Sequence, residues 1–529
     1  WTPGSLAGGN SEEVRSEADI REAASVAHIY GQNLVAAESM TSIQNAFSWH
    51  PEKLKRTADM EMASGLNRFV IHTSVHQPLD DKKPGFSLGP FGQYFTRQET
   101  WAEPAKAWID YLSRSCYLLQ QGKPVVDVLY YYGENNNITQ AFADKLPAIP
   151  TGYEFDFANA TVLKEALRVE GGKIVTPSGQ QYRVLVLDET AKTMTLPVLK
   201  KLNELVRTGA KVVGTKPERS PSLSDNPDAF IALANEIWGD PNVSTKPIDA
   251  VLSEMGVQKD VDVSGAKSKI LYVHRQTATR DGGGAASRPA DIYWLDNRSD
   301  DPNAATVSFR VTGKVPELWN PQTGKTETVS YQIKDGRTII PLKFDSWDAY
   351  FIVFRNKSTV ASFTKPAATE STVAQVDGSW TVSFQDGRGA PGRAQFGQLS
   401  SWTENNDAGI RYFSGTATYE NTVSLPAVAK NGRYVLDLGD VKNMAEIIVN
   451  GKNMGIAWKK PFRVDITEAL KPGANTMQIK VTNLWVNRLI GDAQPGVKNK
   501  VTYTTMPFYR ADSPLLPSRL LGPVRILSN

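Results

Sequence analysis

The sequence predicts a multidomain chain that combines α/β and all-β parts. Its 529 residues are too many for one hydrophobic core. Strand-like runs alternate with helical ones up to about residue 260, and short strand-like runs dominate from there to the C-terminus. We therefore expect the C-terminal part of a (β/α)8 barrel, a flavodoxin-like α/β layer, a small β-sandwich and a C-terminal jelly roll. The expected bounds are 1–123, 124–260, 261–360 and 376–529, with a linker at 361–375.

The expected barrel part rests on two apolar runs that end in polar side chains. Residues 33–37 lead into Glu38, and residues 67–71 lead into His72, with a helix expected between them that begins at Pro51 and ends before Gly65. Such strand and helix pairs are typical of the last turns of a barrel, which as a whole takes ~250 residues. Fewer than about 40 residues precede Glu38. We therefore expect most of the barrel to lie outside this sequence.

Glu38 is the principal candidate for chemistry. In α/β folds the reacting groups lie at the carboxyl ends of the strands, and a buried strand does not tolerate an unpaired charge along its length. A carboxylate at the end of a strand would therefore face a catalytic mouth. The alternative is a structural glutamate at the barrel rim that pairs with a neighbouring Arg or Lys, and the spacing alone does not choose between the two.

A long loop and an expected helix follow His72. Residues 73–98 are rich in aromatic, Pro and Gly residues, which is typical of a lid or a binding loop. Thr100 to Glu103 have the spacing of a capping box, so we expect a helix to open there and Glu103 to cap it. Glu99, one residue earlier, is then the freer carboxylate, and we expect it to contact the substrate.

The later regions are predicted from their strand patterns. Runs at 125–132 and 183–188, with a helix through Leu196–Leu205, predict the α/β layer, and no phosphate-binding glycine pattern follows its first strand. A nucleotide site is therefore disfavoured. Runs at 292–295 and 349–354 predict the sandwich, while runs at 434–439 and 475–481 predict the jelly roll.

Composition excludes several classes of function. The net charge is only +3 and no basic block is interleaved with aromatic residues, so we expect no nucleic-acid partner. No apolar run approaches the ~20 residues of a membrane-spanning helix, so we expect no membrane partner. Cys116 is the only cysteine, which excludes an intrachain disulfide and a cysteine-based zinc site. We expect it to pack on a helix face with Trp108 and Leu112.

Two groups of short motifs, one near each end of the chain, can be compared with known protein families. Near the N-terminus these are Ala37-Glu38-Ser39-Met40-Thr41-Ser42, Asn67-Arg68-Phe69-Val70-Ile71-His72, His76-Gln77-Pro78, Gly89-Pro90-Phe91-Gly92 and Glu99-Thr100-Trp101. They resemble the catalytic module of glycoside hydrolase family 106, the α-L-rhamnosidases. The motifs Val449-Asn450-Gly451, Trp458-Lys459-Lys460-Pro461-Phe462 and Asn483-Leu484-Trp485-Val486-Asn487-Arg488 resemble the galactose-binding-like jelly roll of family 2 glycosidases. The middle layer is more loosely similar to the trimerisation domain of family 42 β-galactosidases.

The resemblance implies an inverting hydrolase that removes terminal α-L-rhamnose, with calcium at the sugar and Glu38 as general base. It also implies a bacterial periplasmic or secreted enzyme. His72 and His76 would donate hydrogen bonds to sugar hydroxyls, although a lone histidine is often structural. Trp101 would either stack on the sugar or anchor the helix. The calcium ligands cannot be assigned from the sequence.

The sequence departs from the family at the general acid, which would lie on an earlier barrel strand. We therefore expect the acid on a missing N-terminal part of the same enzyme, which would then be a partner of this chain, and we expect the chain alone to be inactive. Trp458 and Trp485 are expected to pack within the jelly roll. A competing hypothesis is a non-catalytic carbohydrate-binding scaffold, in which Glu38 would be dispensable.

Overall fold

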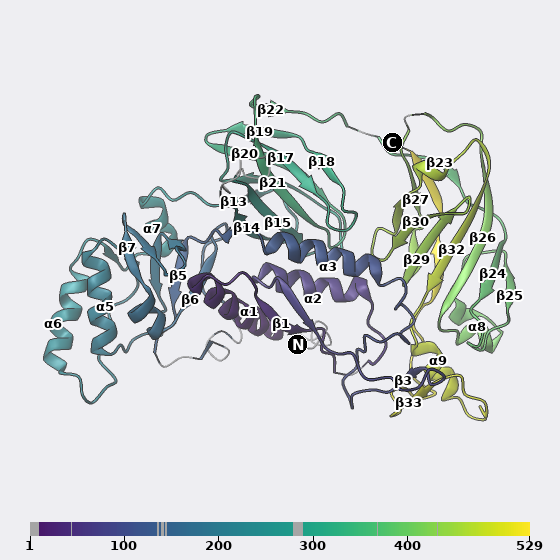
Figure 1. Ribbon diagram of the computed structural model, residues 1–529, viewed down its shortest axis with the longest axis horizontal. Coiled ribbons are helices and arrows are strands. Elements are labelled where there is room, and N and C mark those ends of the chain that lie inside the picture. The colour runs from purple at the N-terminus through teal and green to yellow at the C-terminus, as the bar shows by residue number, and fades with distance from the viewer. Residues whose placement is uncertain are drawn as a thin grey trace.

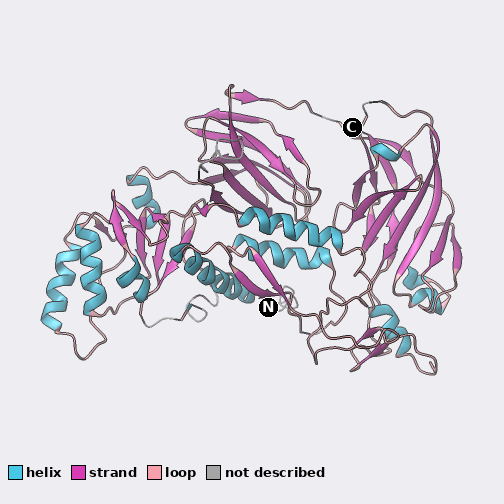
Figure 2. Ribbon diagram, viewed as in Figure 1, coloured by secondary structure: helices cyan, strands magenta, loops and turns pink. Residues whose placement is uncertain are grey.

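A computed structural model describes residues 10–43, 45–134, 137–138, 142, 145–278, 289–367, 369–430 and 432–528. The chain has a mixed α/β and β-rich multidomain fold, as the coarse prediction states. Figure 1 shows a group of helices at the centre of the molecule. An α/β layer lies to the left of these helices, one β-rich body lies above them, and a second β-rich body lies to their right. Figure 2 shows most of the helices at the centre and left of the view, and two strand-rich bodies above and to the right.

The first region contains a two-stranded parallel sheet. Strands β1 and β2 pair in register, with Ala36 opposite Arg68 and Glu38 opposite Val70. Pro51 stands at the first position of the intervening helix, where its missing N–H costs nothing. The elements of the first region are α1 (Asn10–Tyr30), β1 (Ala36–Ser39), α2 (Pro51–Ala63), β2 (Arg68–Ile71), β3 (Pro84–Gly85), α3 (Lys106–Leu119) and β4 (Lys123–Pro124).

The second region is a five-stranded sheet in the order β12-β11-β10-β5-β6, and its strands are parallel. Numbered along the chain, this order is 2-1-3-4-5. Its strands are β5 (Val128–Tyr131), β6 (Phe155–Ala158), β10 (Val184–Leu187), β11 (Val212–Val213) and β12 (Val243–Ser244). Its helices are α5 (Leu196–Arg207), α6 (Pro227–Trp238) and α7 (Ile248–Glu254), and β7 (Arg168–Glu170), β8 (Lys173–Val175) and β9 (Gln181–Tyr182) form a small antiparallel sheet beside it.

The third region consists of two antiparallel sheets around one apolar core. Strand β4 joins it from the first region by pairing with β14, which ties the two regions together. The strands are β13 (Val261–Ser264), β14 (Ile270–Gln276), β15 (Asp291–Asn297), β16 (Asn303–Phe309), β17 (Lys314–Trp319), β18 (Thr326–Thr328), β19 (Tyr331–Lys334), β20 (Arg337–Phe344), β21 (Ala349–Lys357) and β22 (Ser362–Phe363).

The last region also has two main sheets, in the orders β23-β35-β27-β31 and β25-β24-β26-β32-β29-β30. A large apolar core lies between them. The elements are β23 (Ser371–Gln375), β24 (Trp380–Phe384), β25 (Arg393–Phe396), α8 (Ala408–Arg411), β26 (Thr416–Leu425), β27 (Tyr434–Asp437), β28 (Asp440–Lys442), β29 (Met444–Val449), β30 (Lys452–Ala457), β31 (Arg463–Asp465), β32 (Gly473–Thr482), α9 (Val486–Asp492), β33 (Tyr503–Thr504), β34 (Arg519–Gly522) and β35 (Arg525–Ser528).

Two local expectations are corrected. The helix expected at Thr100 begins at Lys106, because residues 100–105 form turns and the capping position Ala105 offers no side-chain cap. The expected linker also carries strand residues at both ends, since β22 pairs with β19 and β23 pairs with β35. In the described part of the chain, no helix is long and apolar enough to cross a bilayer.

Candidate active site

The candidate active site lies at the carboxyl ends of β1 and β2. The two strands turn Ala37, Phe69 and Ile71 toward an apolar cluster that also contains residues of α2 and α3. Because side chains alternate along a strand, Glu38 and His72 lie on the opposite face. That face is open, since Val70, which pairs with Glu38, is 52% exposed. The structure therefore brings Glu38 and His72 to one accessible face of the sheet.

Among the described residues, Thr41 is the hydrogen-bond partner of the Glu38 carboxylate. The Thr41 hydroxyl donates a hydrogen bond of 2.7 Å to Glu38 Oε1. Arg68 lies on the same face of the sheet, but within the described residues Glu38 forms no ion pair with it or with any other cation. The rim-glutamate alternative requires such a pair. The geometry instead leaves an exposed carboxylate whose charge is uncompensated by neighbouring side chains.

The loops after β1 and β2 contact each other above this face. Ile43 and Phe91 form an isolated antiparallel bridge, and the backbone N–H of Gly92 donates to the Ser42 carbonyl at 2.7 Å. The half-buried His72 ring lies edge-on to Phe91, with 5.7 Å between the ring centroids. His76 is exposed on the following loop. His72 is thus held at the mouth by packing, while His76 is accessible farther along the loop.

Glu99 is not the free carboxylate that was expected. It is only 5% exposed, and one of its oxygens accepts hydrogen bonds from the Thr100 N–H at 2.9 Å and from the Thr100 hydroxyl at 3.2 Å. Burial raises the pKa of Glu99 to about 8, although these two hydrogen bonds and the Arg388 charge act in the opposite direction. The prediction of a substrate contact by Glu99 is corrected, because the side chain is enclosed by protein.

Trp101 is likewise enclosed. It is 3% exposed, its indole N–H donates to the Trp49 carbonyl at 3.1 Å, and its ring packs edge-on against Trp108. A sugar has no access to either face of this ring. Of the two roles weighed for Trp101, the structure supports the anchoring one and corrects the stacking one.

Sequence reasoning missed the contribution of the last region to this end of the molecule. Arg388 lies over the Trp485 ring, 4.1 Å from its centroid, and the Trp485 N–H donates to the Gln98 carbonyl at 2.9 Å. Trp485 therefore packs on the loop after β2 and not inside the jelly roll as expected. Trp458 makes a similar contact with Tyr111 of α3, at 5.6 Å between ring centroids. The motifs around both tryptophans were visible, but their partners lie hundreds of residues away in the chain.

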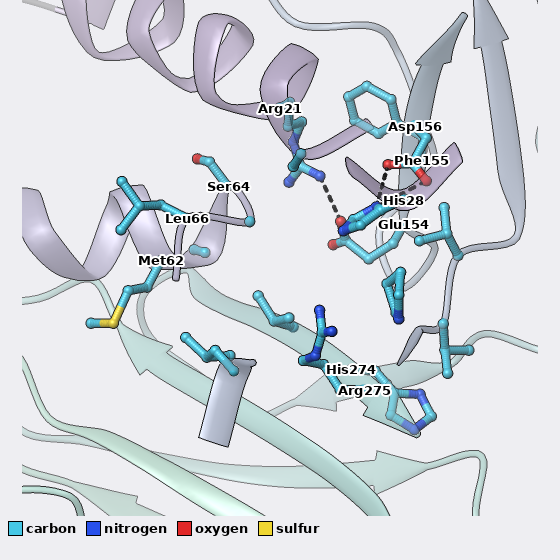
Figure 3. A pocket seen from close by; sticks show the side chains of 18 residues that line it. Arg21, His28, Met62, Ser64, Leu66, Glu154, Phe155, Asp156, His274 and Arg275 are labelled. Atoms are coloured by element: carbon cyan, nitrogen blue, oxygen red, sulfur yellow. Dashed lines mark hydrogen bonds and ion pairs between the residues drawn. The ribbon is translucent and has the colours of Figure 1, made fainter. Parts of the chain in front are cut away.

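A small cavity elsewhere in the molecule is too small for a sugar. Its volume is about 30 Å³, which suits a water molecule, whereas ligand pockets take roughly 300–1,000 Å³. Figure 3 shows Arg21 reaching Glu154 on one side and His28 reaching Asp156, with Arg275 below. The Arg21 to Glu154 and His28 to Asp156 distances are 2.7 and 2.8 Å. These pairs join α1 to β6 and have a structural role.

The described residues offer no ready-made metal centre. Within them, no group of three or more His, Cys, Asp or Glu side chains is arranged to hold an ion. Glu99 has one buried oxygen without a hydrogen-bond partner, but Arg388 is its charged neighbour, which disfavours a cation there. Cys116 is half-buried, and burial raises the pKa of its thiol to about 12, so it has no nucleophilic character.

Two family models match the chain. The family model described as alpha-L-rhamnosidase, glycoside hydrolase family 106, matches residues 1–333. A second model, glycosyl hydrolase 2 galactose-binding domain-like, matches residues 400–511.

Two individual proteins are similar over nearly the whole chain. The structure of a rhamnosidase from Novosphingobium sp. PP1Y superposes with a TM-score of 0.91 and 43% sequence identity, covering 98% of this chain and 50% of that one. A curated protein of Formosa agariphila, described as "Putative beta-glucuronidase", is 27% identical and covers 95% of this chain and 63% of that protein. The chain thus spans about half to two thirds of the length of these relatives. By the match of its first 333 residues, the chain belongs to glycoside hydrolase family 106.

Proposed function

We propose that the chain forms the C-terminal part of an inverting α-L-rhamnosidase in which Glu38 is the general base. The observation that carries this proposal is the exposed Glu38 carboxylate, which has no ion pair among the described residues and shares an open sheet face with His72. Family membership and the similarity to a rhamnosidase support the substrate class. Terminal α-L-rhamnose on a glycan or glycoside is the proposed substrate.

The open face of the sheet supports an incomplete barrel. Parallel sheets are normally covered on both faces, yet Leu34 is 44% and Val70 52% exposed here. We propose that this face is the inner wall of a (β/α)8 barrel whose other strands lie on polypeptide outside residues 1–123. That polypeptide, an N-terminal part of the same enzyme, would be the chain's partner.

The remaining domain assignments are proposed with it. The strand order 2-1-3-4-5 supports a flavodoxin-like layer at 124–260, since doubly wound folds of that class have this order. The two antiparallel sheets of the third region support a β-sandwich at 261–360. The two sheets of the last region and the galactose-binding-like match at 400–511 support a jelly roll at 376–529 after the linker.

The proposed chemistry needs two carboxyl groups with different tasks. In an inverting mechanism the base removes a proton from water while the acid protonates the leaving oxygen, and the two are roughly 6.5–9.5 Å apart. Glu38 is suited to the first task because it is exposed to solvent and has no ion pair among the described residues. Its hydrogen bond from Thr41 holds one oxygen and leaves the other for the water. The acid would come from the other part of the barrel.

His72 and His76 are proposed to contact the sugar. His72 lies on the same face as Glu38, and its packing against Phe91 restricts the ring, so it can hold a hydroxyl in a fixed direction. His76 is exposed and could reach the sugar from the loop. Calcium at the sugar and a periplasmic or secreted location are proposed from the family resemblance. The calcium ligands would come largely from outside the described residues.

The test is Glu38→Gln in the whole enzyme, assayed on an aryl α-L-rhamnoside. A general base contributes roughly 10² to 10⁴-fold, so we expect a loss of that size with the fold unchanged. Glu103→Gln is the matched control, since Glu103 is an exposed glutamate of the same region outside the open face. NMR detection of the rhamnose anomer that is released first tests whether the reaction inverts the anomeric configuration.

Two outcomes would contradict the proposal. Wild-type turnover by Glu38→Gln would favour the non-catalytic scaffold. Hydrolysis by the 529-residue chain alone would show that the acid is not on another part of the polypeptide.

A further inference from the structure

A large groove lies where the first region, the α/β layer and the third region meet. Its volume is about 880 Å³, within the size range of pockets that enclose small ligands. We call it the junction groove. Asn33, which precedes β1, lines it, so it opens at the amino end of the β1 and β2 sheet, whereas Glu38 lies at the carboxyl end. The residues on which the argument depends are Lys123, Asp127, Lys173, Arg183, Asp291 and Arg310.

Both carboxylates of the groove are neutralised. Arg310 binds Asp127 through two nitrogens, with Nη2 at 3.0 and 3.2 Å from the two carboxylate oxygens. Asp291 accepts from Lys314 at 2.7 Å and from His274 at 3.3 Å. The acidic side chains of the groove therefore have partners and contribute little net negative charge.

Three cations of the groove have no such compensation. The Lys123 ammonium donates to the Ser178 carbonyl at 2.7 Å, and the Lys173 ammonium donates to the side-chain oxygen of Gln181 at 3.0 Å. Arg183 lies 4.0 Å from Asp127, which Arg310 approaches more closely at 3.0 Å, and the Arg183 side chain is 46% exposed. Within the described residues, none of the three has a closer carboxylate. The groove is therefore electropositive.

The rest of the lining includes amide groups that can bind hydroxyls. Gln180, Gln181 and Gln276 contribute amides from two different regions. The Gln181 oxygen accepts from Lys173, and the Gln276 amide nitrogen donates to Asp291 at 2.8 Å, so a ligand would use the Gln181 nitrogen and the Gln276 oxygen. No Phe, Tyr or Trp is found among the described lining residues, so ring stacking would not supply the affinity. A ligand matched to this lining carries negative charge and many hydroxyl groups.

We propose that the junction groove binds an acidic saccharide, in which Arg183 and Lys173 hold a sugar carboxylate and the glutamine amides hold hydroxyls. A guanidinium presents two parallel N–H donors to a carboxylate, and such charge-assisted hydrogen bonds are about twice as strong as neutral ones. The choice of a saccharide rests on the proposed function, while the negative charge rests on the groove alone. Binding here would place a glycan chain away from the cleavage site.

The experiment is calorimetric titration of the 529-residue chain with trigalacturonic acid. We expect binding that weakens as salt rises, and at least a ~10-fold weaker affinity for the double variant Arg183→Gln, Lys173→Gln. Lys200→Gln is the matched control, because Lys200 is an exposed lysine on α5 of the same layer. It should bind as the wild type does.

Several results would overturn this proposal. They are no binding, equal binding of neutral galactotriose, equal binding by the double variant, or equal competition by free acetate, which would show a simple anion site. Failure of the proposed function is distinguishable: Glu38→Gln should leave groove binding intact, and the double variant should leave aryl rhamnoside turnover intact in the whole enzyme.

Discussion

Two parallel sheets of this molecule differ in how completely they are covered. In the five-stranded sheet, β5, β6 and β10 are buried at every position, with apolar clusters on both faces. In the two-stranded sheet, Ala36, Glu38, Arg68 and Val70 are all exposed on one face. The described part of the first sheet is covered on both faces. The second sheet combines an open face with a carboxylate that has no ion pair among the described residues, which is why we place the chemistry there.

The largest expected effect tests the difference in burial. Leu185 of β10 is fully buried, so Leu185→Ala should cost about 2–5 kcal/mol of unfolding free energy. Val70→Ala in β2 should change it by less than about 0.5 kcal/mol in the 529-residue chain, because Val70 is already exposed. Urea unfolding of both variants measures this. Equal losses would show that the two sheets are not differently covered.

A second substitution asks whether the open face is covered in the whole enzyme. Val70→Asp should be nearly neutral in the 529-residue chain, where the carboxylate reaches water. In the whole enzyme it should destabilise by about 2–3 kcal/mol, because the charge would be enclosed in the barrel. Arg68→Asp is the comparison variant, because Arg68 is exposed on the same face at the start of β2. If thermal unfolding shows Val70→Asp to be as well tolerated in the whole enzyme, the barrel proposal fails.

Helix α2, which packs on the covered side of the two-stranded sheet, contains a buried carboxylate that should make the unfolding free energy depend on pH. Burial raises the pKa of Glu61 on α2 to about 8, from an ordinary value of 4.5. The folded state therefore holds a proton that the unfolded chain releases, so stability should fall as the pH rises from about 4.5 to 8. We expect a loss of about 2–3 kcal/mol between pH 5 and 7, since a shift of one pKa unit corresponds to about 1.4 kcal/mol. Glu61→Gln should flatten this dependence, and an unchanged slope in pH-dependent unfolding would contradict the assignment.

Local patterns in the sequence predicted much of the fold. The run at 183–188 contains β10, and the leucine spacing at 196–205 contains α5, because these elements bury side chains in a simple period. The capping box at Thr100 failed because the turns at 100–105 delay the helix until Lys106, and nothing in the spacing reveals that delay. The open face was not predicted, since a run of apolar residues does not show which neighbours are present.

The candidate site was predicted less well than the fold. Glu38 and His72 were placed to within one residue of the strand ends, since β1 ends at Ser39 and β2 at Ile71, because a short apolar run shows where its strand stops. Glu99 and Trp101 were misjudged because their burial depends on partners such as Trp49 and Arg388, which are distant in sequence. The junction groove has residues from three regions and no local motif, so no linear pattern points to it.

The short pairing of β3 with β33 has a further consequence. Pro84 and Gly85 of the long loop pair with Tyr503 and Thr504, and a side chain at Gly85 would collide with Gln77 and Gln98. This pairing holds the loop that contains His76 against the last region. Coupling between two sites is reciprocal. On the proposed function, a glycan that ordered this loop would also stabilise the attachment of the last region, and release of that region would weaken glycan binding.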